Sequence, residues 1–323
     1  MWPFSKKTSI AQSGILRGAT DHHSHILPGV DDGVESMDEA LRILATYEAA
    51  GVKELWLTPH IMEDIPNTPE KLLTHFAELQ AAYTGSITLH LAAEYMIDNH
   101  LRSLLNELTE GNNTNKKCPS FKRGTSNTGN IAQEVQDDNN YPSSKREYPQ
   151  GDGVEKKSNT DNNCPSSGRG TSNAQCIAEG VKDNNNSPSS KEKLLPIGKK
   201  HNHLLVETSY YNPPMRLHET LRQIKSLGYH PLLAHPERYM YMDEEEYIRL
   251  HQEGVKFQMN LPSICGGYGN TVKKRAQWLL KKGLYDVIGS DTHCEEGVEY
   301  LLGSRHKEKD LRALQTLLSQ TPR

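Results

Sequence analysis

Two short stretches place paired donor side chains where a strand could direct both at one ion. His23-Ser-His25 lies early in the chain, and Asp291-Thr-His293 lies late in it. Residues i and i+2 of a strand point to the same side, so both members of each pair can reach the same ion. One such pair is weak, because surface histidines also pair by chance, so further donors are needed.

Five further donors lie at the ends of apolar runs or in turns. Glu94 and Glu207 each end a run that reads as a buried strand, where a carboxylate is costly unless it is paired or metal-bound. The full set of candidate metal ligands is His23, His25, Asp32, His60, Glu94, Glu207, His235, Asp291 and His293. The absence of cysteine from this set favours a hydrolytic site over a structural zinc site.

Imidazole and carboxylate ligands together suit manganese, iron or zinc. Five histidines and four carboxylates exceed the needs of one ion. We therefore expect two or three divalent cations that share a bridging carboxylate.

These donors can form one site only if the strands that carry them end at a common place. Helices are expected between the strands, and a capping box of Ser36 and Glu39 opens the helix over residues 37–50, which Gly51 ends. Repeated helix–Gly–strand units indicate a parallel α/β architecture. The expected strands cover residues 19–27, 53–60, 87–94, 203–209, 231–236, 256–261 and 286–293.

Seven strands with intervening helices favour a closed or nearly closed β/α barrel over an open doubly wound sheet. In a barrel, the carboxyl ends of all strands meet on one face. An open sheet would spread the same donors along a line, because neighbouring strands are about 4.8 Å apart.

The composition divides the chain into three parts. Residues 1–18 are expected to be an N-terminal tail, and residues 19–111 and 193–323 one catalytic domain. Residues 112–192 are rich in Asn, Ser, Lys and Gly and contain a repeat, since the segment from Cys118 returns at Cys164. Such a polar segment buries too little apolar surface to fold, so we expect a long disordered insertion, which is either a docking arm or a tolerated repeat element.

Several functional classes are disfavoured. The formal net charge of -4 gives no general reason to bind nucleic acid, and no apolar run is long enough for a membrane span. The N-terminal residues lack the apolar core of a signal peptide, so a cytoplasmic location is expected. None of the five cysteines begins the C-x5-R pattern of a cysteine-nucleophile phosphatase.

The stretches "DHHSHILPGVDDG", "AAEYMIDNHL", "HLLVETSYYNPPM" and "GYHPLLAHPERYMYM" resemble the polymerase-and-histidinol-phosphatase (PHP) superfamily, and within it the bacterial capsular and exopolysaccharide tyrosine-protein phosphatases. The resemblance implies a distorted seven-stranded β/α barrel with a trinuclear, typically manganese, centre. One ion would take His23, His25, Glu94 and Asp291. A second would take Glu94, Glu207 and His235, and the third Asp32, His60 and His293.

By the same resemblance, Arg238 would hold the phosphate, and His235 and Asp291 would join it as catalytic residues. From the residues alone, Arg238 could equally pair with Glu237 or a helix carboxylate. The family often has another arginine soon after the Asp-x-His stretch, but here the next arginine is Arg305.

The implied reaction is hydrolysis of phosphotyrosine on a protein by a metal-bound hydroxide. The implied partner is a bacterial tyrosine kinase tail that controls capsular or exopolysaccharide synthesis. Two alternatives stay open: a small-molecule phosphatase of the histidinol-phosphate type, and a metal-bound module that binds a phosphoprotein without cleaving it.

Overall fold

The computed structural model describes residues 7–114, 194–198 and 202–318. The predicted insertion therefore lies almost wholly outside the described residues, and only its first three residues are seen, at the end of a helix. The strands are β1 (Lys7–Ser9), β2 (Thr20–Asp21), β3 (Glu54–Leu57), β4 (His60–Ile61), β5 (Thr88–Leu91), β6 (Glu94–Met96), β7 (His203–Glu207), β8 (His230–Ala234), β9 (Lys256–Asn260), β10 (Val287–Gly289) and β11 (Arg305–Lys307).

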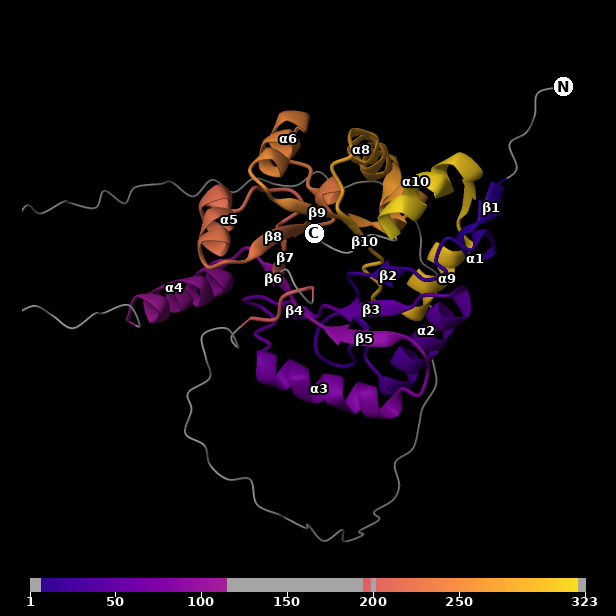
Figure 1. The fold of residues 1–323 in the computed structure, drawn as a ribbon, viewed down its shortest axis with the longest axis horizontal. Helices are drawn as coiled ribbons and strands as arrows, with labels where there is room; N and C mark the ends of the chain where they lie inside the picture. The colour runs from indigo at the N-terminus through magenta and orange to yellow at the C-terminus, as the bar shows by residue number, and fades with distance from the viewer. Residues whose placement is uncertain (1–6, 115–193, 199–201, 319–323) are drawn as a thin grey trace, which may run out of the picture. The chain divides into compact units, whose positions relative to one another are not determined.

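Helices follow most of these strands and pack around them (Figure 1). They are α1 (Ile10–Ser13), α2 (Met37–Ala50), α3 (Pro69–Ala82), α4 (Asn99–Thr114), α5 (Leu217–Ser226), the short 3-10 helix η2 (Pro236–Arg238), α6 (Glu244–Gln252), α7 (Leu261–Cys265), α8 (Gly269–Lys282), α9 (Glu295–Gly303) and α10 (Glu308–Leu318). Among the described residues, no helix combines the length and apolar character needed to cross a bilayer.

The parallel strands form a curled sheet that closes on itself. One ladder runs β10-β9-β8-β7-β6-β4 and another runs β2-β3-β5. β3 and β4 together occupy one predicted strand, and β5 and β6 another. Backbone bonds continue the second ladder beyond its strands, from Thr58 N to Ser24 O at 2.8 Å and from Ala92 N to Leu57 O at 2.8 Å, and a parallel bridge between Ser24 and Thr292 joins it to the end of β10. The prediction of a seven-stranded α/β barrel is thus confirmed.

Local sequence signals explain where the helices begin and end. Ser36 Oγ accepts a hydrogen bond from Glu39 N at 3.3 Å at the start of α2. Gly51 ends that helix with a φ of 94°, a conformation that costs glycine little. Thr68 caps α3 in the same way, ahead of Pro69 in the first turn.

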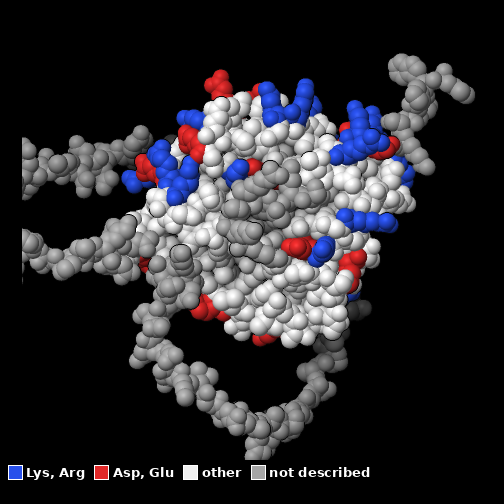
Figure 2. Space-filling view, viewed as in Figure 1, with Lys and Arg blue, Asp and Glu red and all other residues white. Residues whose placement is uncertain are grey.

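The outer faces of the helices carry most of the charge. Lysine and arginine side chains gather over α5, α8 and α10 on the face shown in Figure 2. Lys281 and Lys282 lie in the last turn of α8, where their positive charges interact favourably with the helix dipole. The apolar faces turn inward, as with the buried Ile43, Leu44 and Tyr47 of α2.

One predicted boundary is wrong. Residues 7–18 were expected to belong to a tail, but β1 pairs antiparallel with β11 through Thr8 and His306. Ile10 is fully buried, and its N–H donates to Ser304 O at 3.1 Å. This segment is ordered because it packs against a distant part of the chain, which its own short sequence does not indicate.

The barrel closes at a seam between β2 and β10. His22 N donates to Ile288 O at 3.1 Å, and Asp291 N donates to His23 O at 2.8 Å. Asp21 Oδ1 accepts from His23 N at 3.1 Å and from Ser290 N at 2.9 Å, which ties both sides of the seam to one carboxylate. Burial raises the pKa of Asp21 to about 6, although the bonds from Ser290 and His23 oppose this.

We predict that Asp21→Ala destabilises the barrel by about 1–3 kcal/mol, because it leaves two buried amides without an acceptor. Urea unfolding followed by circular dichroism would measure the loss. Asp21→Asn is the matched control, since its amide oxygen can still accept both bonds, and it should stay within about 1 kcal/mol of the parent. Equal unfolding midpoints for all three proteins would contradict a role for Asp21 in closing the seam.

Candidate metal centre

The structure brings all nine predicted ligands together at the carboxyl ends of the strands. Their ligand atoms fall into four groups, within each of which all atoms lie within 4.8 Å of one another. The groups are His25, Asp32, His60 and His293; His23, His25 and Glu94; His23, His235 and Asp291; and His60, Glu94 and Glu207.

Glu94 lies at the centre of this cluster. Its Oε2 is 3.1 Å from His23 Nε2, 3.2 Å from His25 Nε2 and 3.3 Å from His60 Nδ1. Its Oε1 is 3.2 Å from His235 Nε2. Burial acts to raise the pKa of Glu94, but His23 and the other imidazoles hold it well below its usual range. A carboxylate whose two oxygens face different histidines suits a bridging ligand.

His23 and His25 point their Nε2 atoms at one spot, only 3.0 Å apart. The other ring nitrogen of each is already engaged: His23 Nδ1 lies 2.9 Å from Gln258 Oε1, and His25 Nδ1 lies 2.7 Å from Asp31 Oδ2. Both acceptors take the N–H at Nδ1, so Nε2 is the nitrogen left to each ring for ligating a cation. Such outer hydrogen bonds are usual for metal-binding histidines.

In the Asp31-Asp32-Gly33 turn, Asp31 and Gly33 have different structural roles. Asp31 also accepts from Gly33 N at 3.1 Å and from His60 N at 3.0 Å. Burial opposes ionisation, but the bond and charge of His25 lower the pKa of Asp31 to about 2. A Cβ at position 33 would lie 2.2 Å from His25 O, so only glycine fits there. The motif was recognised in the sequence, but the part played by Asp31 was not predicted.

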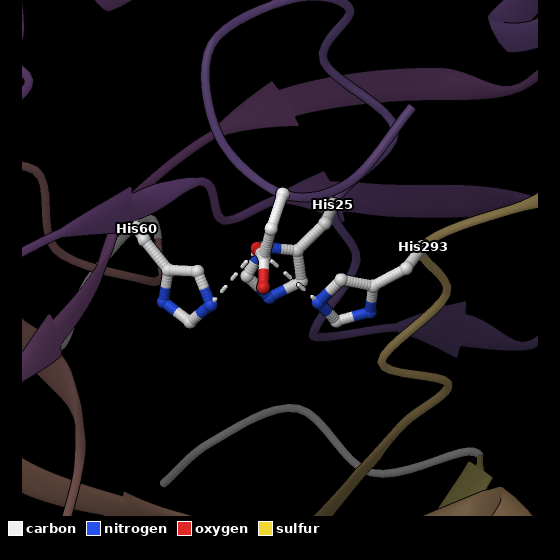
Figure 3. A group of neighbouring side chains, drawn as sticks. His25, His60 and His293 are labelled. Atoms are coloured by element: carbon white, nitrogen blue, oxygen red, sulfur yellow. Dashed lines mark ion pairs between the residues drawn. The ribbon is translucent and has the colours of Figure 1, made fainter. Parts of the chain in front are cut away.

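Asp32 belongs to the outer, more exposed edge of the cluster. Its side chain is 63% exposed, and its Oδ1 lies 3.4 Å from His60 Nε2 and 3.7 Å from His293 Nε2. Figure 3 shows His25, His60 and His293 converging from three separate segments. The resemblance implied a third ion held by Asp32, His60 and His293, and the geometry adds His25 to that group.

The inner carboxylates, Glu94 and Glu207, are less exposed, and the negative charge of one disfavours ionisation of the other. Glu207 lies 3.3 Å from His60 Nδ1 and 3.7 Å from His235 Nε2. Burial, aided by the charge of Glu94, raises the pKa of Glu207 well above its usual range. His235 therefore faces both carboxylates that were expected to share its ion.

Asp291 joins the cluster to Arg238. Its Oδ2 accepts from Arg238 Nη1 at 2.8 Å and from Asn260 Nδ2 at 2.8 Å. Its Oδ1 lies 3.5 Å from His23 Nε2. Arg238 thus pairs with Asp291 rather than with Glu237, which is buried elsewhere and accepts from Tyr285 OH at 2.8 Å.

Two ligand residues have backbone conformations that favour glycine. His235 has a φ of 31° and Asp291 a φ of 53°. Each such residue costs about 1–3 kcal/mol and persists only where its surroundings hold it. Backbone strain at His235, three residues before Arg238, and at Asp291, which pairs with Arg238, is typical of a functional site.

Buried polar atoms in the cluster give a second reason to expect divalent cations there. Glu94 Oε1 and His60 Nδ1 are buried, and although each lies within 3.3 Å of a ligand atom, neither makes a well-aligned hydrogen bond among the described residues. Buried polar atoms without partners are rare, and coordination would satisfy both. His22, by contrast, lies outside all four groups, and its Nδ1 is 3.2 Å from Ile288 O, as expected for the opposite face of the strand.

A cavity of about 810 Å³ opens above the cluster. Arg238 is the one lysine or arginine among its lining residues, all of which are described. Arg305 does not line it and instead donates to Lys7 O at 2.9 Å. The remaining walls include four tyrosines, which are Tyr210, Tyr211, Tyr268 and Tyr300.

Comparisons with known proteins add to this geometry. The sequence matches the family described as "Capsular polysaccharide synthesis, CpsB/CapC" over residues 19–115 and 184–299. Tyrosine-protein phosphatase CpsB of Streptococcus pneumoniae is 23% identical over 281 residues, which span 84% of this chain and 82% of that protein. The protein CapC of Staphylococcus aureus is 25% identical over 113 residues, which are 34% of this chain. The match covers 44% of CapC, which is less than half of that protein.

A solved structure has the same fold. It is one of the crystal structures of YwqE from Bacillus subtilis and CpsB from Streptococcus pneumoniae, which are described as unique metal-dependent tyrosine phosphatases. The alignment has a TM-score of 0.57 at 16% identity and covers 94% of this chain and 95% of the solved one.

We predict that Asp31→Ala weakens manganese binding about 10- to 100-fold, because His25 loses the acceptor that orients it. Titration calorimetry with manganese would measure the affinity. Glu35→Ala removes an exposed carboxylate from the same loop and should leave the affinity unchanged. If Asp31→Ala bound manganese as tightly as the parent, the Asp31–His25 bond would have no part in the centre.

Proposed function

Because this chain belongs to the CpsB/CapC family of capsular polysaccharide synthesis, we propose that it is a metal-dependent phosphatase that hydrolyses phosphotyrosine on protein. One observation carries the proposal: five histidines and four carboxylates converge beneath a cavity whose described lining residues include a single arginine. The relatives named as tyrosine-protein phosphatases support the same substrate class.

The ligand atoms divide naturally between an inner and an outer part. His23, His25, Glu94 and Asp291 would hold one ion, and Glu94 with Glu207 and His235 a second. Asp32, His60 and His293 would hold the third, at the exposed edge. Imidazole and carboxylate donors suit manganese, iron or zinc, and the family resemblance makes manganese the first candidate. Bound cations of this kind act as Lewis acids toward phosphoryl oxygens and lower the pKa of water.

Arg238 supplies the fixed positive charge of the cavity. Its guanidinium is planar and can bind two phosphoryl oxygens at once through parallel N–H groups. Asp291 accepts from one of its nitrogens at 2.8 Å, which directs the rest of the fork along the cavity wall. The phosphoryl group would therefore lie between this arginine and the ligand cluster.

The substrate class follows from the walls as well as from the relatives. Tyr210, Tyr268 and Tyr300 line the cavity, and such rings suit an aromatic leaving group. Phenolate also leaves readily, since its conjugate acid has a pKa of about 10. In a capsule-synthesis family, the fitting substrate is the phosphorylated tail of a bacterial tyrosine kinase. The expected cytoplasmic location stays a prediction.

We predict metal-dependent hydrolysis of a phosphotyrosyl peptide, assayed beside histidinol phosphate with added manganese and with a chelator. The chelator and His235→Ala should each lower the peptide rate by at least about 10³-fold, since bound metal contributes several kcal/mol to such reactions. Turnover of histidinol phosphate alone would retain the metal chemistry and reassign the substrate. Manganese binding without turnover of either compound would favour the binding-module alternative.

We also predict that Arg238→Ala lowers kcat/KM for the peptide by about 10²- to 10³-fold, because one charged donor to the phosphoryl group is lost. Arg238→Lys should recover only part of this, as an ammonium lacks the planar fork. Arg249→Ala serves as the control, because that arginine is 57% exposed on α6 and pairs with Glu246. An unchanged kcat/KM in Arg238→Ala would exclude Arg238 from phosphate binding.

A further inference from the structure

Arg238 is held between two aromatic rings. Its guanidinium carbon lies 4.2 Å from the centre of the Tyr210 ring and 4.3 Å from the centre of the Tyr268 ring. Tyr210 follows β7, whereas Tyr268 lies between α7 and α8. Two elements far apart in the sequence therefore contact the same cation, and each contact at this distance is attractive.

Both rings are fixed by contacts of their own. Tyr210 O accepts from Met240 N at 2.7 Å, which ties the loop after β7 to the segment just beyond Arg238. Tyr268 OH lies 3.4 Å from Asn260 Nδ2, and that nitrogen also donates to Asp291 Oδ2 at 2.8 Å. The chain of contacts runs from Tyr268 through Asn260 and Asp291 back to Arg238.

The turn that carries Tyr268 leaves little freedom. Gly266 and Gly269 on either side have φ values of 98° and 84°, which few other residues adopt. A Cβ at Gly267 would lie 3.3 Å from Pro262 O and 3.4 Å from the Tyr300 ring. The Gly-Gly-Tyr-Gly stretch over residues 266–269 thus sets one ring at a defined place in the cavity wall.

We propose that Tyr210 and Tyr268 are positioning residues, which fix the plane of the Arg238 guanidinium so that it meets the phosphoryl oxygens with both N–H groups. This inference rests on the proposed function. Among the described residues that line the cavity there is no other lysine or arginine, so the orientation of this one fork decides how well these residues hold a phosphate group. A second arginine, which could compensate for a misplaced first one, is absent from these lining residues.

The rings have a second conceivable use, as a surface on which the substrate's own ring stacks. Inorganic phosphate separates the two uses, because it has no ring and reports only on the phosphate-binding groups. Its direct binding also does not depend on catalytic turnover.

The experiment is a calorimetric titration of the full-length, manganese-loaded protein with inorganic phosphate. Tyr268→Leu and Tyr210→Leu should each weaken phosphate binding about 5- to 30-fold, from the loss of one cation–π contact. Tyr268→Phe and Tyr210→Phe keep the rings and should stay within about threefold of the parent. Tyr83→Leu, which removes a tyrosine ring that does not line the cavity, should leave phosphate binding unchanged.

The decisive readout is the double variant. If Tyr268 acts through Arg238, adding Tyr268→Leu to Arg238→Ala should cause no further loss of phosphate binding. Additive losses, or phosphate binding that is unchanged in the leucine variants while the peptide KM rises, would overturn the positioning role. Failure of the proposed function would look different, since the phosphate results could hold in a protein that turns over no phosphotyrosyl peptide.

Discussion

Two carboxylates that cannot both stay ionised without help are the constraint on which the site depends. Glu94 and Glu207 are both almost fully buried at the strand ends. Burial acts to raise the pKa of each, yet imidazoles around Glu94 keep its pKa far below the usual range while the pKa of Glu207 rises far above it. Such opposed shifts in neighbouring groups are typical of functional sites, and positive ions between them would stabilise both as carboxylates.

The barrel is what makes this concentration of charge possible. The ligands come from six strand ends and the segments that follow them; His23, His25 and Asp32 share the segment after β2, and Asp291 and His293 share the one after β10. Apolar layers lie beneath them, with Leu205, Leu232 and Val287 packed inside the barrel. The outer hydrogen bonds of Gln258 and Asp31 then orient the imidazoles before any ion arrives.

Much of this arrangement was predictable from the sequence, because strand ends and helix caps are local signals. Ser36, Gly51 and Thr68 mark helix ends through their own backbone and side-chain chemistry, and α2 begins and ends at the predicted residues. His25 was recognisable from its i, i+2 spacing with His23. Glu94 was recognisable because a carboxylate that ends an apolar run is costly without a partner. What was missed depends on contacts between distant segments. Asp31 acquires its function only where the fold brings His25 and the His60 amide against it.

The same reasoning explains the other misses. β1 and β11 have three residues each and exist only because they pair with each other. The rings of Tyr210 and Tyr268 give no sequence signal as partners of Arg238, since a tyrosine near a strand end is most often part of a core. The resemblance led us to look for a second arginine after His293, and the structure instead surrounds one arginine with aromatic rings.

The seam between β2 and β10 has a consequence for how the protein is made. Its hydrogen bonds join residues as far apart as His22 and Ile288, which are 266 positions apart. His23 leaves the ribosome early, while Asp291 and His293 leave it late, so a nascent chain holds only a partial set of ligands. Contacts of such long range form slowly, because a long loop must close first. The complete set of donors can therefore assemble only after residue 293 has left the ribosome and β10 has docked against β2.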